Sequence, residues 1–248
     1  EDSTILGGDC KAGIAAILEG LTAALESSDP LRSVEVAFTR QEEIGLVGAQ
    51  NLDFSRIKAQ RAIVFDGEGP PTQITSSSPT HVSFEVDVTG RAAHAGVEPE
   101  KGLSSIRVSA ELIVRLPQGR IDDETTFNIG IINGGSVTNA VPEKTKIRGE
   151  FRSHNPEAIS KISDDVNNAI ENVRVLFPEA ILDLTMNTRF EAYSIDENDA
   201  AVEMLATAFG VLGKDFAMLP SGGGTDGNVF RMHGISAAVV GMADHNAH

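Results

Sequence analysis

The sequence predicts an α/β protein in which a mixed, mostly parallel β-sheet is flanked by helices and interrupted by an inserted α+β domain. Two patterns lead to this prediction. In residues 1–74 and 188–248, apolar stripes at helical spacing alternate with short apolar runs that end in acidic residues, which is typical of parallel sheets. Residues 75–187 follow the order β-α-β-β-α-β, the split pattern of ferredoxin-like domains. We therefore expect the two outer stretches to fold together around the middle one.

The first outer stretch begins with a helix. Its apolar residues fall at helical spacing on one stripe: Ile14, Ile17, Leu18, Leu21 and Leu25. Asp9 lies at the entrance of this helix, where an acid can cap the first turn or, in a glycine-rich turn, bridge metal ions. A second, short helix is expected near residues 46–52.

Two predicted strands of this stretch end in carboxylates. Residues Val34–Phe38 alternate between apolar and polar side chains, and Glu42 and Glu43 follow them. Neighbours on an extended chain point to opposite sides, so the two glutamates would have different roles. Ala62–Phe65 is a fully apolar run, typical of a strand buried on both faces, and it ends at Asp66.

The middle stretch alternates strands and helices of another kind. Strands are expected at 82–88, 126–132, 144–151 and 181–186. One helix is expected over 103–116, with an inward face formed by Ile106, Ala110, Ile113 and either Val114 or Leu116. The second helix follows Asn155, an N-cap residue before proline, and runs to about 177.

The last stretch returns to the first pattern, with a helix after Asp196, a glycine loop at 221–228 and an apolar strand at 236–240. His245 follows this strand. Strand ends of one open sheet converge on one edge, so the acids and the histidine would cluster there and need a cation to offset their repulsion. Imidazole and carboxylate ligands suit zinc, with cobalt or manganese as alternatives. The expected ligands are Asp9, Glu43, Asp66 and His245.

Composition excludes several functions. The formal net charge of −16 argues against a nucleic acid or an anionic membrane as partner. The single cysteine, Cys10, permits no internal disulfide and favours a reducing, cytoplasmic location. Cys10 itself can be an inert small hydrophobic residue or an oxidisable neighbour of a metal. Because the sequence starts without Met, we expect a fragment of a longer polypeptide.

Six motifs in this order resemble those of the M20 metallopeptidases, and most closely their peptidase T-like branch. The motifs are Leu6-Gly-Gly-Asp9-Cys10-Lys11-Ala-Gly13, Thr39-Arg-Gln-Glu42-Glu43-Ile-Gly45, Phe65-Asp66-Gly67, His94-Ala-Gly96, Thr138-Asn139-Ala-Val-Pro142 and Ser221-Gly-Gly-Gly-Thr-Asp226. The resemblance implies a dizinc catalytic domain formed by the outer stretches and an inserted lid, residues 75–187, that also mediates homodimerisation.

The resemblance also implies roles for individual residues. Asp9 would bridge the two metals, with Glu43, Asp66 and His245 as further ligands. Glu42 would be the general base that activates a metal-bound water. His94 would stabilise the oxyanion, reaching the site of a partner subunit. Asn139 and Arg152 would hold a carboxylate of a short peptide substrate, and the cleft would be lined by Gly223 and Gly224.

Some alternatives stay open. The family has a His-x-Asp segment before the region that this sequence covers, so the chain can be a catalytically incomplete fragment that binds metal weakly. An aminoacylase-type amidohydrolase would share the fold. His248 competes with His245 as a metal ligand. The glycines at 222, 224 and 227 formally fit a dinucleotide-binding pattern, but Asp226 within the loop would repel a pyrophosphate.

Overall fold

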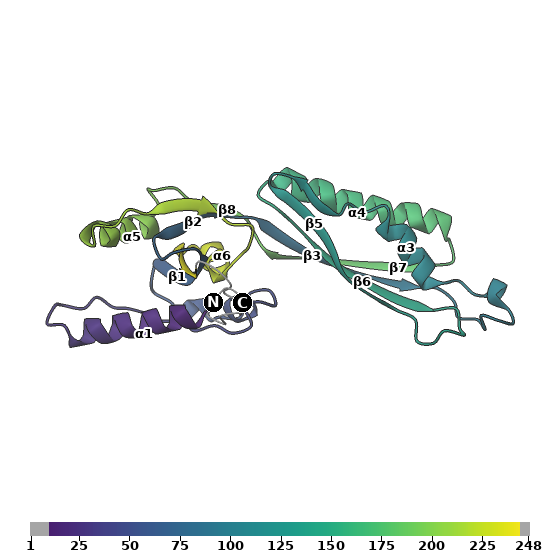
Figure 1. Cartoon of the computed structure of the whole chain (residues 1–248), viewed down its shortest axis with the longest axis horizontal. Coiled ribbons are helices and arrows are strands. Elements are labelled where there is room, and N and C mark those ends of the chain that lie inside the picture. The colour runs from purple at the N-terminus through teal and green to yellow at the C-terminus, as the bar shows by residue number, and fades with distance from the viewer. Residues whose placement is uncertain (1–9, 244–248) are drawn as a thin grey trace, which may run out of the picture. The chain divides into compact units, whose positions relative to one another are not determined.

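The computed structural model describes residues 10–243, and the chain divides into two compact units (Figure 1). Unit 1 comprises residues 1–78 and 190–248, and unit 2 comprises residues 79–189. Within residues 10–243, none of the helices is both long enough and apolar enough to cross a membrane.

Unit 1 contains a mixed five-stranded sheet. Its strands are β1 (Arg61–Glu68), β2 (Gln73–Ser78), β8 (Tyr193–Ser194), β9 (Ala217–Pro220) and β10 (Ser236–Ala243). The order is β1-β10-β2-β8, and β9 pairs with β2. β10 is parallel to β1 and antiparallel to β2, while β9 runs parallel to β2. Among the described strands, β1 therefore forms one edge of the sheet. The predicted α/β class is confirmed, although antiparallel pairs contribute more than we expected.

Helices cover both faces of this sheet. They are α1 (Lys11–Glu26), α2 (Val47–Gln50), α5 (Ala200–Val211) and α6 (Asp226–Met232), with a 3-10 turn at Phe54–Arg56. Residues of α5 share a buried cluster with Ala238 and Val240, whereas Gly227 of α6 lies against Val239 on the opposite face. The N-cap of α5 is Asp199 rather than the predicted Asp196, because the helix begins only at Ala200.

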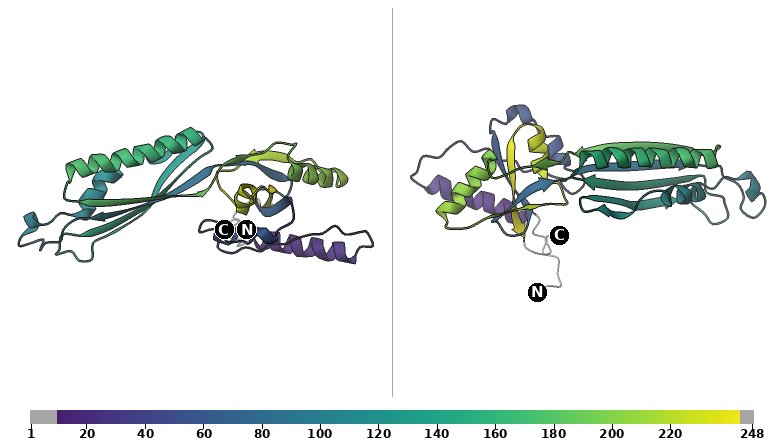
Figure 2. Two further views of the ribbon diagram at one scale, coloured as in Figure 1. Left: turned by 180° about the vertical axis from the view of Figure 1, so that it is seen from behind. Right: turned by 90° about the horizontal axis from the view of Figure 1, so that it is seen from above.

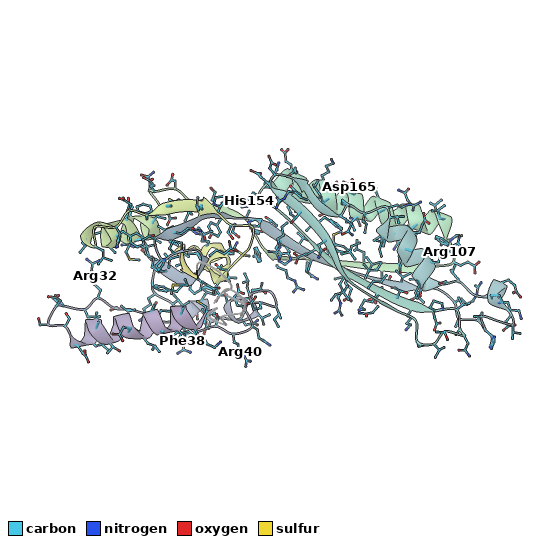
Figure 3. All side chains as sticks on the ribbon, viewed as in Figure 1. Arg32, Phe38, Arg40, Arg107, His154 and Asp165 are labelled. Carbon is cyan, nitrogen blue, oxygen red and sulfur yellow. The ribbon has the colours of Figure 1, made fainter. Side chains whose placement is uncertain are left out.

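The strand expected at Val34–Phe38 is absent. The segment belongs to neither sheet, and the side chains of Val34, Val36 and Phe38 are exposed. Figure 3 shows Phe38 and Arg40 projecting from the surface. In the apolar stripe of α1, Ile14, Leu18 and Leu25 are also exposed, and the one buried residue of the helix is Gly13. An alternating pattern specifies a strand only where a neighbouring strand completes the ladder, and the described residues supply none here.

Unit 2 is a five-stranded sheet with helices on one face (Figure 2). The strands are β3 (Thr80–Thr89), β4 (Gly119–Asp122), β5 (Thr125–Gly134), β6 (Lys144–Ser153) and β7 (Ile181–Phe190), in the order β4-β5-β6-β3-β7. The helices are α3 (Ser105–Ile113) and α4 (Pro156–Leu176), with a 3-10 turn at Pro99–Lys101. Apart from the short β4, this is the predicted β-α-β-β-α-β arrangement.

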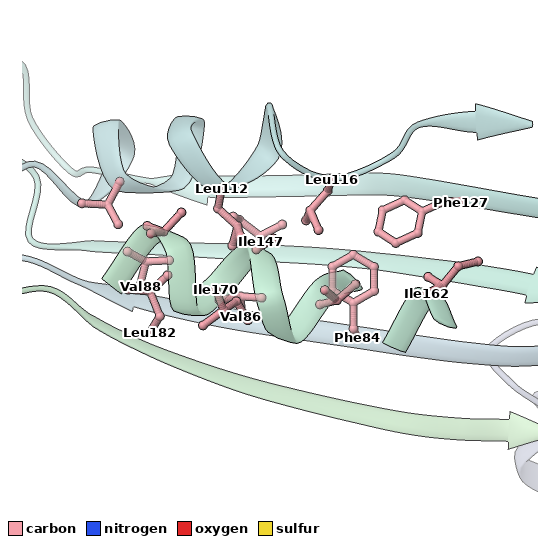
Figure 4. Close-up of a cluster of buried hydrophobic side chains, with 14 of the residues drawn as sticks. Phe84, Val86, Val88, Leu112, Leu116, Phe127, Ile147, Ile162, Ile170 and Leu182 are labelled. Atoms are coloured by element: carbon pink, nitrogen blue, oxygen red, sulfur yellow. The ribbon is translucent and has the colours of Figure 1, made fainter. Parts of the chain in front are cut away.

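The core of unit 2 lies between its sheet and its helices (Figure 4). Alternate residues of β3, including Val82, Phe84 and Val86, are buried. The predicted inward face of α3 is only partly right: Ile113 packs against the core, but Ile106 is exposed, and Val108 and Leu112 are the buried residues. The true face includes Ser105, whose hydroxyl is 2.8 Å from that of Thr145, and a purely apolar pattern could not recognise it.

Candidate functional site

Glu42 and Glu43 lie in a tight turn that leads into α2. The carbonyl of Glu42 accepts hydrogen bonds from the amides of Gly45 and Leu46, at 3.0 and 2.8 Å. The amide of Val47 donates to Gln41, and that of Gly48 donates to Arg40 at 3.0 Å. Four backbone hydrogen bonds thus fold the chain back on itself around the two glutamates.

The backbone of this turn is strained. In the described part of the chain, the non-glycine residues with positive φ are Gln41, at 61°, and Leu46, at 59°, and both flank the glutamate pair. The left-handed conformation costs roughly 1–2 kcal/mol for a residue with a Cβ atom. Backbone strain of this kind persists only where surrounding contacts fix it, and it is concentrated at functional sites.

Leu46 provides one of these contacts. Its side chain is only 2% exposed and packs in a small apolar cluster with Ala49, Phe190 and Val229. Gly48 lets the chain approach itself closely, because a Cβ atom there would lie 2.5 Å from the carbonyl oxygen of Arg40. The downstream end of the turn is therefore anchored in the core of unit 1.

A buried polar network holds the glycine loop. The side-chain amide of Asn228 donates to the Ser78 hydroxyl at 2.9 Å and to the carbonyl of Glu191 at 3.0 Å, and its oxygen accepts from the amide of Thr225. The Ser78 hydroxyl donates to the carbonyl of Gly223 at 2.8 Å. Asn228 and Ser78 are both fully buried, so the loop is fixed from inside the unit.

Gly224 packs against an aromatic ring. A Cβ atom at this position would lie 2.1 Å from Cζ of Phe190, so only glycine fits. Gly222 has open space around it. Of the two glycines predicted to line the cleft, Gly224 therefore has a packing role, and Gly223 presents its carbonyl to Ser78.

One contact joins the glycine loop to the glutamate turn. The Thr39 hydroxyl donates a hydrogen bond to Oδ2 of Asp226, the first residue of α6. Burial raises the pKa of the Asp226 carboxyl, and the bond from Thr39 opposes this shift. The other carboxylate oxygen, Oδ1, is buried without a hydrogen-bond partner among the described residues.

Asp66 lies at an irregularity in β1. Phe65 pairs with Val240 and Gly67 pairs with Gly241, so Asp66 is an extra residue in the ladder. Bulges of this kind redirect a side chain. The Cys10 thiol donates to the carbonyl of Phe65, the residue before Asp66. The start of α1 and the end of β1 therefore meet next to Asp66.

The metal site is only partly described. Asp9 and His245 lie outside the described residues, which leaves Glu43 and Asp66 from the expected ligand set. Among residues 10–243, no three His, Cys, Asp or Glu side chains come together in a way that could hold a metal ion. Glu43 and Asp66 offer carboxylate oxygens, a donor type that zinc, cobalt and manganese accept.

His94 and Asn139 lie together in unit 2. The amide of Ala95 donates to the carbonyl of Asn139 at 3.0 Å, and His94 forms an isolated β-bridge with Ala140. Both His94 and Asn139 are exposed. Nδ1 of His94 accepts from the amide of Gly96 at 3.2 Å, which helps to orient the imidazole. Asn139 lies in the segment just before β6, which begins at Lys144.

Arg152 lies near the other end of β6, in a charged cluster. Its Nε and Nη2 atoms are 3.1 and 2.9 Å from Oε1 of Glu150, and Nε2 of His81 is 3.0 Å from Oε2 of the same carboxylate. The close contact with His81, together with the charge of Arg152, lowers the pKa of Glu150 to about 2.

These two groups of unit 2 cannot act on one carboxylate in a single protomer. From Lys144, where β6 begins, to Arg152 is a distance of about 26 Å at the usual rise of a strand. Asn139 precedes Lys144 and belongs with His94. The structure therefore brings Asn139 to His94 and does not bring it to Arg152.

Residues 77–175 match the family model described as the peptidase dimerisation domain. Over its whole length, the chain is 34% identical to a Bacillus subtilis protein described as uncharacterized protein YqjE and covers 67% of it. A tripeptidase structure from Staphylococcus aureus matches 96% of the chain at 31% identity, with a TM-score of 0.83. The structure of aminopeptidase PepT from Bacillus cereus matches 96% at 36% identity, with a TM-score of 0.78.

The chain belongs to the M20 peptidase family, on its peptidase T-like branch. It covers 64% of the length of each of the two solved structures, so it spans less than two thirds of these M20 relatives. Unit 2 contains most of the residues that match the M20 dimerisation domain. The predicted family is thus confirmed.

Sequence reasoning missed several residues that shape this M20 site. Thr39, Asn228 and Glu150 are held by specific polar contacts, yet none belongs to the predicted set. One signal was available: Thr225 and Asn228 have the three-residue spacing of a capping box, and the structure contains that box. The contact between Thr39 and Asp226, 187 residues apart, had no local signal.

Proposed function

We propose that this protein is a metal-dependent peptidase that hydrolyses short peptides, with Glu42 as the general base. The observation that carries the proposal is the strained Glu42–Glu43 turn, which is anchored by Leu46 and tied to the glycine loop through Thr39. The similarity of the chain to a tripeptidase and to an aminopeptidase supports a peptide substrate.

The metal ligands we propose are Asp9, Glu43, Asp66 and His245, in a dizinc site in which cobalt or manganese could replace zinc. When bound, the ions would supply a water of lowered pKa and a positive charge near the scissile carbonyl. Asp66 is suited to a ligand role because the irregular ladder at β1 places it outside the regular alternation of the strand. The lone cysteine is compatible with a reducing compartment such as the cytoplasm.

Glu42 would take a proton from the attacking water and return it to the leaving amine. The backbone hydrogen bonds of the turn fix the segment that carries Glu42, which supports this role. His94 would donate to the developing oxyanion. Arg152 would bind a substrate carboxylate through its planar guanidinium group.

The site would be shared between two subunits of a homodimer. His94 and Asn139 lie at one end of unit 2, and Arg152 lies near the other. We infer that His94 and Asn139 act at the site of the partner subunit. The match to a peptidase dimerisation domain supports an assembly through unit 2.

The decisive experiment is a hydrolysis assay. It uses the longest available polypeptide that contains this sequence, loaded with zinc, cobalt or manganese. We expect tripeptides to be hydrolysed and N-acyl amino acids to be poor substrates; the reverse preference would favour an aminoacylase. Glu42→Gln should lower kcat by about 10²–10⁴-fold with unchanged metal content. The matched control, Glu26→Gln at the exposed end of α1, should leave kcat unchanged.

Metal content measured by plasma emission separates the remaining possibility. Near-stoichiometric metal without hydrolysis of any tested peptide or acyl amino acid would contradict the proposed activity. Little bound metal in these 248 residues alone, restored by a longer form that carries a His-x-Asp segment, would support an incomplete site in this part of the polypeptide.

A further inference from the structure

We propose that Asp226 is a positioning residue: by holding the Thr39 hydroxyl, it fixes the turn that carries Glu42 and Glu43. The proposal rests on the proposed function for the roles of the two glutamates, but its structural basis is independent of that function. The hydrogen bond from Thr39 to Asp226 joins two motifs that lie 187 residues apart in the chain.

The upstream side of the turn has few other anchors. Residues 31–39 belong to no helix or strand, and the side chains of Val36 and Phe38 are exposed. Glu35 lies four residues before Thr39, and its carboxylate accepts hydrogen bonds from the backbone amides of Lys58 and Ala59. The bond from Thr39 therefore ties the residues just before the turn to another element, α6, and it lies next to a turn whose backbone is strained at Gln41 and Leu46.

Asp226 is itself held rigidly. It is the first residue of α6, directly after the N-cap Thr225, which forms a reciprocal capping box with Asn228. The next residue, Gly227, is buried, and a Cβ atom there would lie 2.7 Å from Cγ2 of Val239 in the sheet. A group anchored this firmly can fix the position of a less constrained segment.

The burial of Asp226 is not needed by the helix. A carboxylate in the first turn favours a helix equally well when it is exposed to water. Here the side chain is mostly buried, which costs free energy for a carboxylate, and its described hydrogen-bond partner is Thr39. A buried acid whose described contact leads to the glutamate turn is explained by a role in positioning that turn.

The test compares four variants in the full polypeptide loaded with metal. Thr39→Val removes the hydroxyl with little change in shape, and Asp226→Ala removes the acceptor. Both should lower kcat by about 10- to 100-fold with little change in KM, because misplacing a catalytic group by about 1 Å has an effect of this size. Thr39→Ser and Asp226→Asn keep a donor and an acceptor, and each should restore most of the loss.

Amide hydrogen exchange reports on the turn without relying on activity. The amides of Gly45, Leu46, Val47 and Gly48 donate the hydrogen bonds of the turn, so they should exchange faster in Thr39→Val and Asp226→Ala. The matched control is Thr145→Val, which removes a buried hydroxyl contact with Ser105 in unit 2. It should change neither kcat nor the exchange of these amides.

Each outcome bears on the proposal separately from the proposed function. Unchanged exchange and unchanged kcat in Thr39→Val would overturn the positioning role and leave the peptidase proposal intact. Suppose that the turn amides exchange faster in the two variants, but that the wild-type protein hydrolyses none of the tested peptides. This result would support the link between Asp226 and the turn and contradict the peptidase proposal. If Asp226→Ala fails to fold, Thr39→Val decides, because Thr39 is only half-buried.

Discussion

The guanidinium of Arg152 contacts one oxygen of the Glu150 carboxylate through two nitrogens, Nε at 3.1 Å and Nη2 at 2.9 Å. His81 occupies the other oxygen at 3.0 Å. The three side chains lie near the end of the β3–β6 ladder at which Thr80 pairs with Ser153, and His81 is directly opposite Arg152. A carboxylate held in this way makes the stability of unit 2 depend on pH.

The pKa of Glu150 is lowered from its ordinary 4.5 to about 2, so the ionised form stabilises the fold. This contribution is complete above pH 4.5 and is lost as the pH falls towards 2. Glu150→Gln should therefore reduce the free energy of unfolding by about 1 kcal/mol at pH 7, after allowance for solvent screening of a partly exposed group. The gap between wild type and variant should shrink below pH 4.5.

Urea unfolding at several pH values measures this gap. The control is Glu171→Gln, which removes an exposed ion pair with Arg174 and should change the free energy by less than about 0.5 kcal/mol. A gap for Glu150→Gln that stays constant between pH 7 and pH 3 would show that the lowered pKa does not contribute.

A shared site predicts complementation between two inactive proteins. His94→Ala and Glu42→Gln should each be inactive alone, but a mixed dimer would contain one site with both residues intact. After subunit exchange, an equal mixture should recover about a quarter of wild-type activity, since half of the dimers are mixed and each has one complete site. A mixture of Glu42→Gln with Asp66→Asn should recover nothing, because both changes lie in unit 1. No recovery from the first mixture despite verified exchange would rule out sharing.

Two glycines of one loop should respond differently to the same substitution. Gly224→Ala would place a methyl group within 2.6 Å of three ring atoms of Phe190, and overpacking of this kind costs about 1–3 kcal/mol. Gly222→Ala meets nothing and should change the free energy of unfolding by less than about 0.5 kcal/mol. Chemical denaturation of both variants checks the difference. Equal effects would mean that the ring of Phe190 moves aside without cost.

The strain at Gln41 predicts a stabilising glycine. Gln41 is exposed and has a φ of 61°, so Gln41→Gly should remove a left-handed penalty and raise the free energy of unfolding by about 0.5–1 kcal/mol. Glu19→Gly, at an exposed position inside α1, should lower it by about 1 kcal/mol. The measurement is thermal or urea unfolding of unit 1 in both variants. A loss of stability in Gln41→Gly would mean that the side chain makes a contact worth more than the strain.

The sequence was sufficient for elements whose signals are local. Asn155 before Pro156 correctly located the start of α4, and the alternation of β3 correctly separated its buried and exposed faces. It failed where the outcome depends on distant partners. Val34–Phe38 has the pattern of a strand but no neighbour to pair with among the described residues. The buried face of α3 contains Ser105, which is buried only because Thr145 lies opposite.

The candidate site divides in the same way. The resemblance of the motifs to those of the M20 family named Glu42, Asp66 and His94, and their roles stay predictions. The groups that fix their geometry were not visible. Glu150 holds Arg152, which lies on the same strand, β6. The Glu150 carboxylate is also contacted by His81 of β3, and the sequence does not reveal how β3 and β6 are aligned.

The place of β1 at the margin of its sheet has a consequence for handling the protein. In the described part of the chain, β10 pairs with β1 along one side, and along the other side the carbonyl of Phe65 accepts from Cys10 but no second strand is added. Such a margin is a template on which any extended peptide of suitable alternation can add itself. Isolated samples of this polypeptide should therefore self-associate by strand addition, and covering that margin should be the first step in keeping them monodisperse.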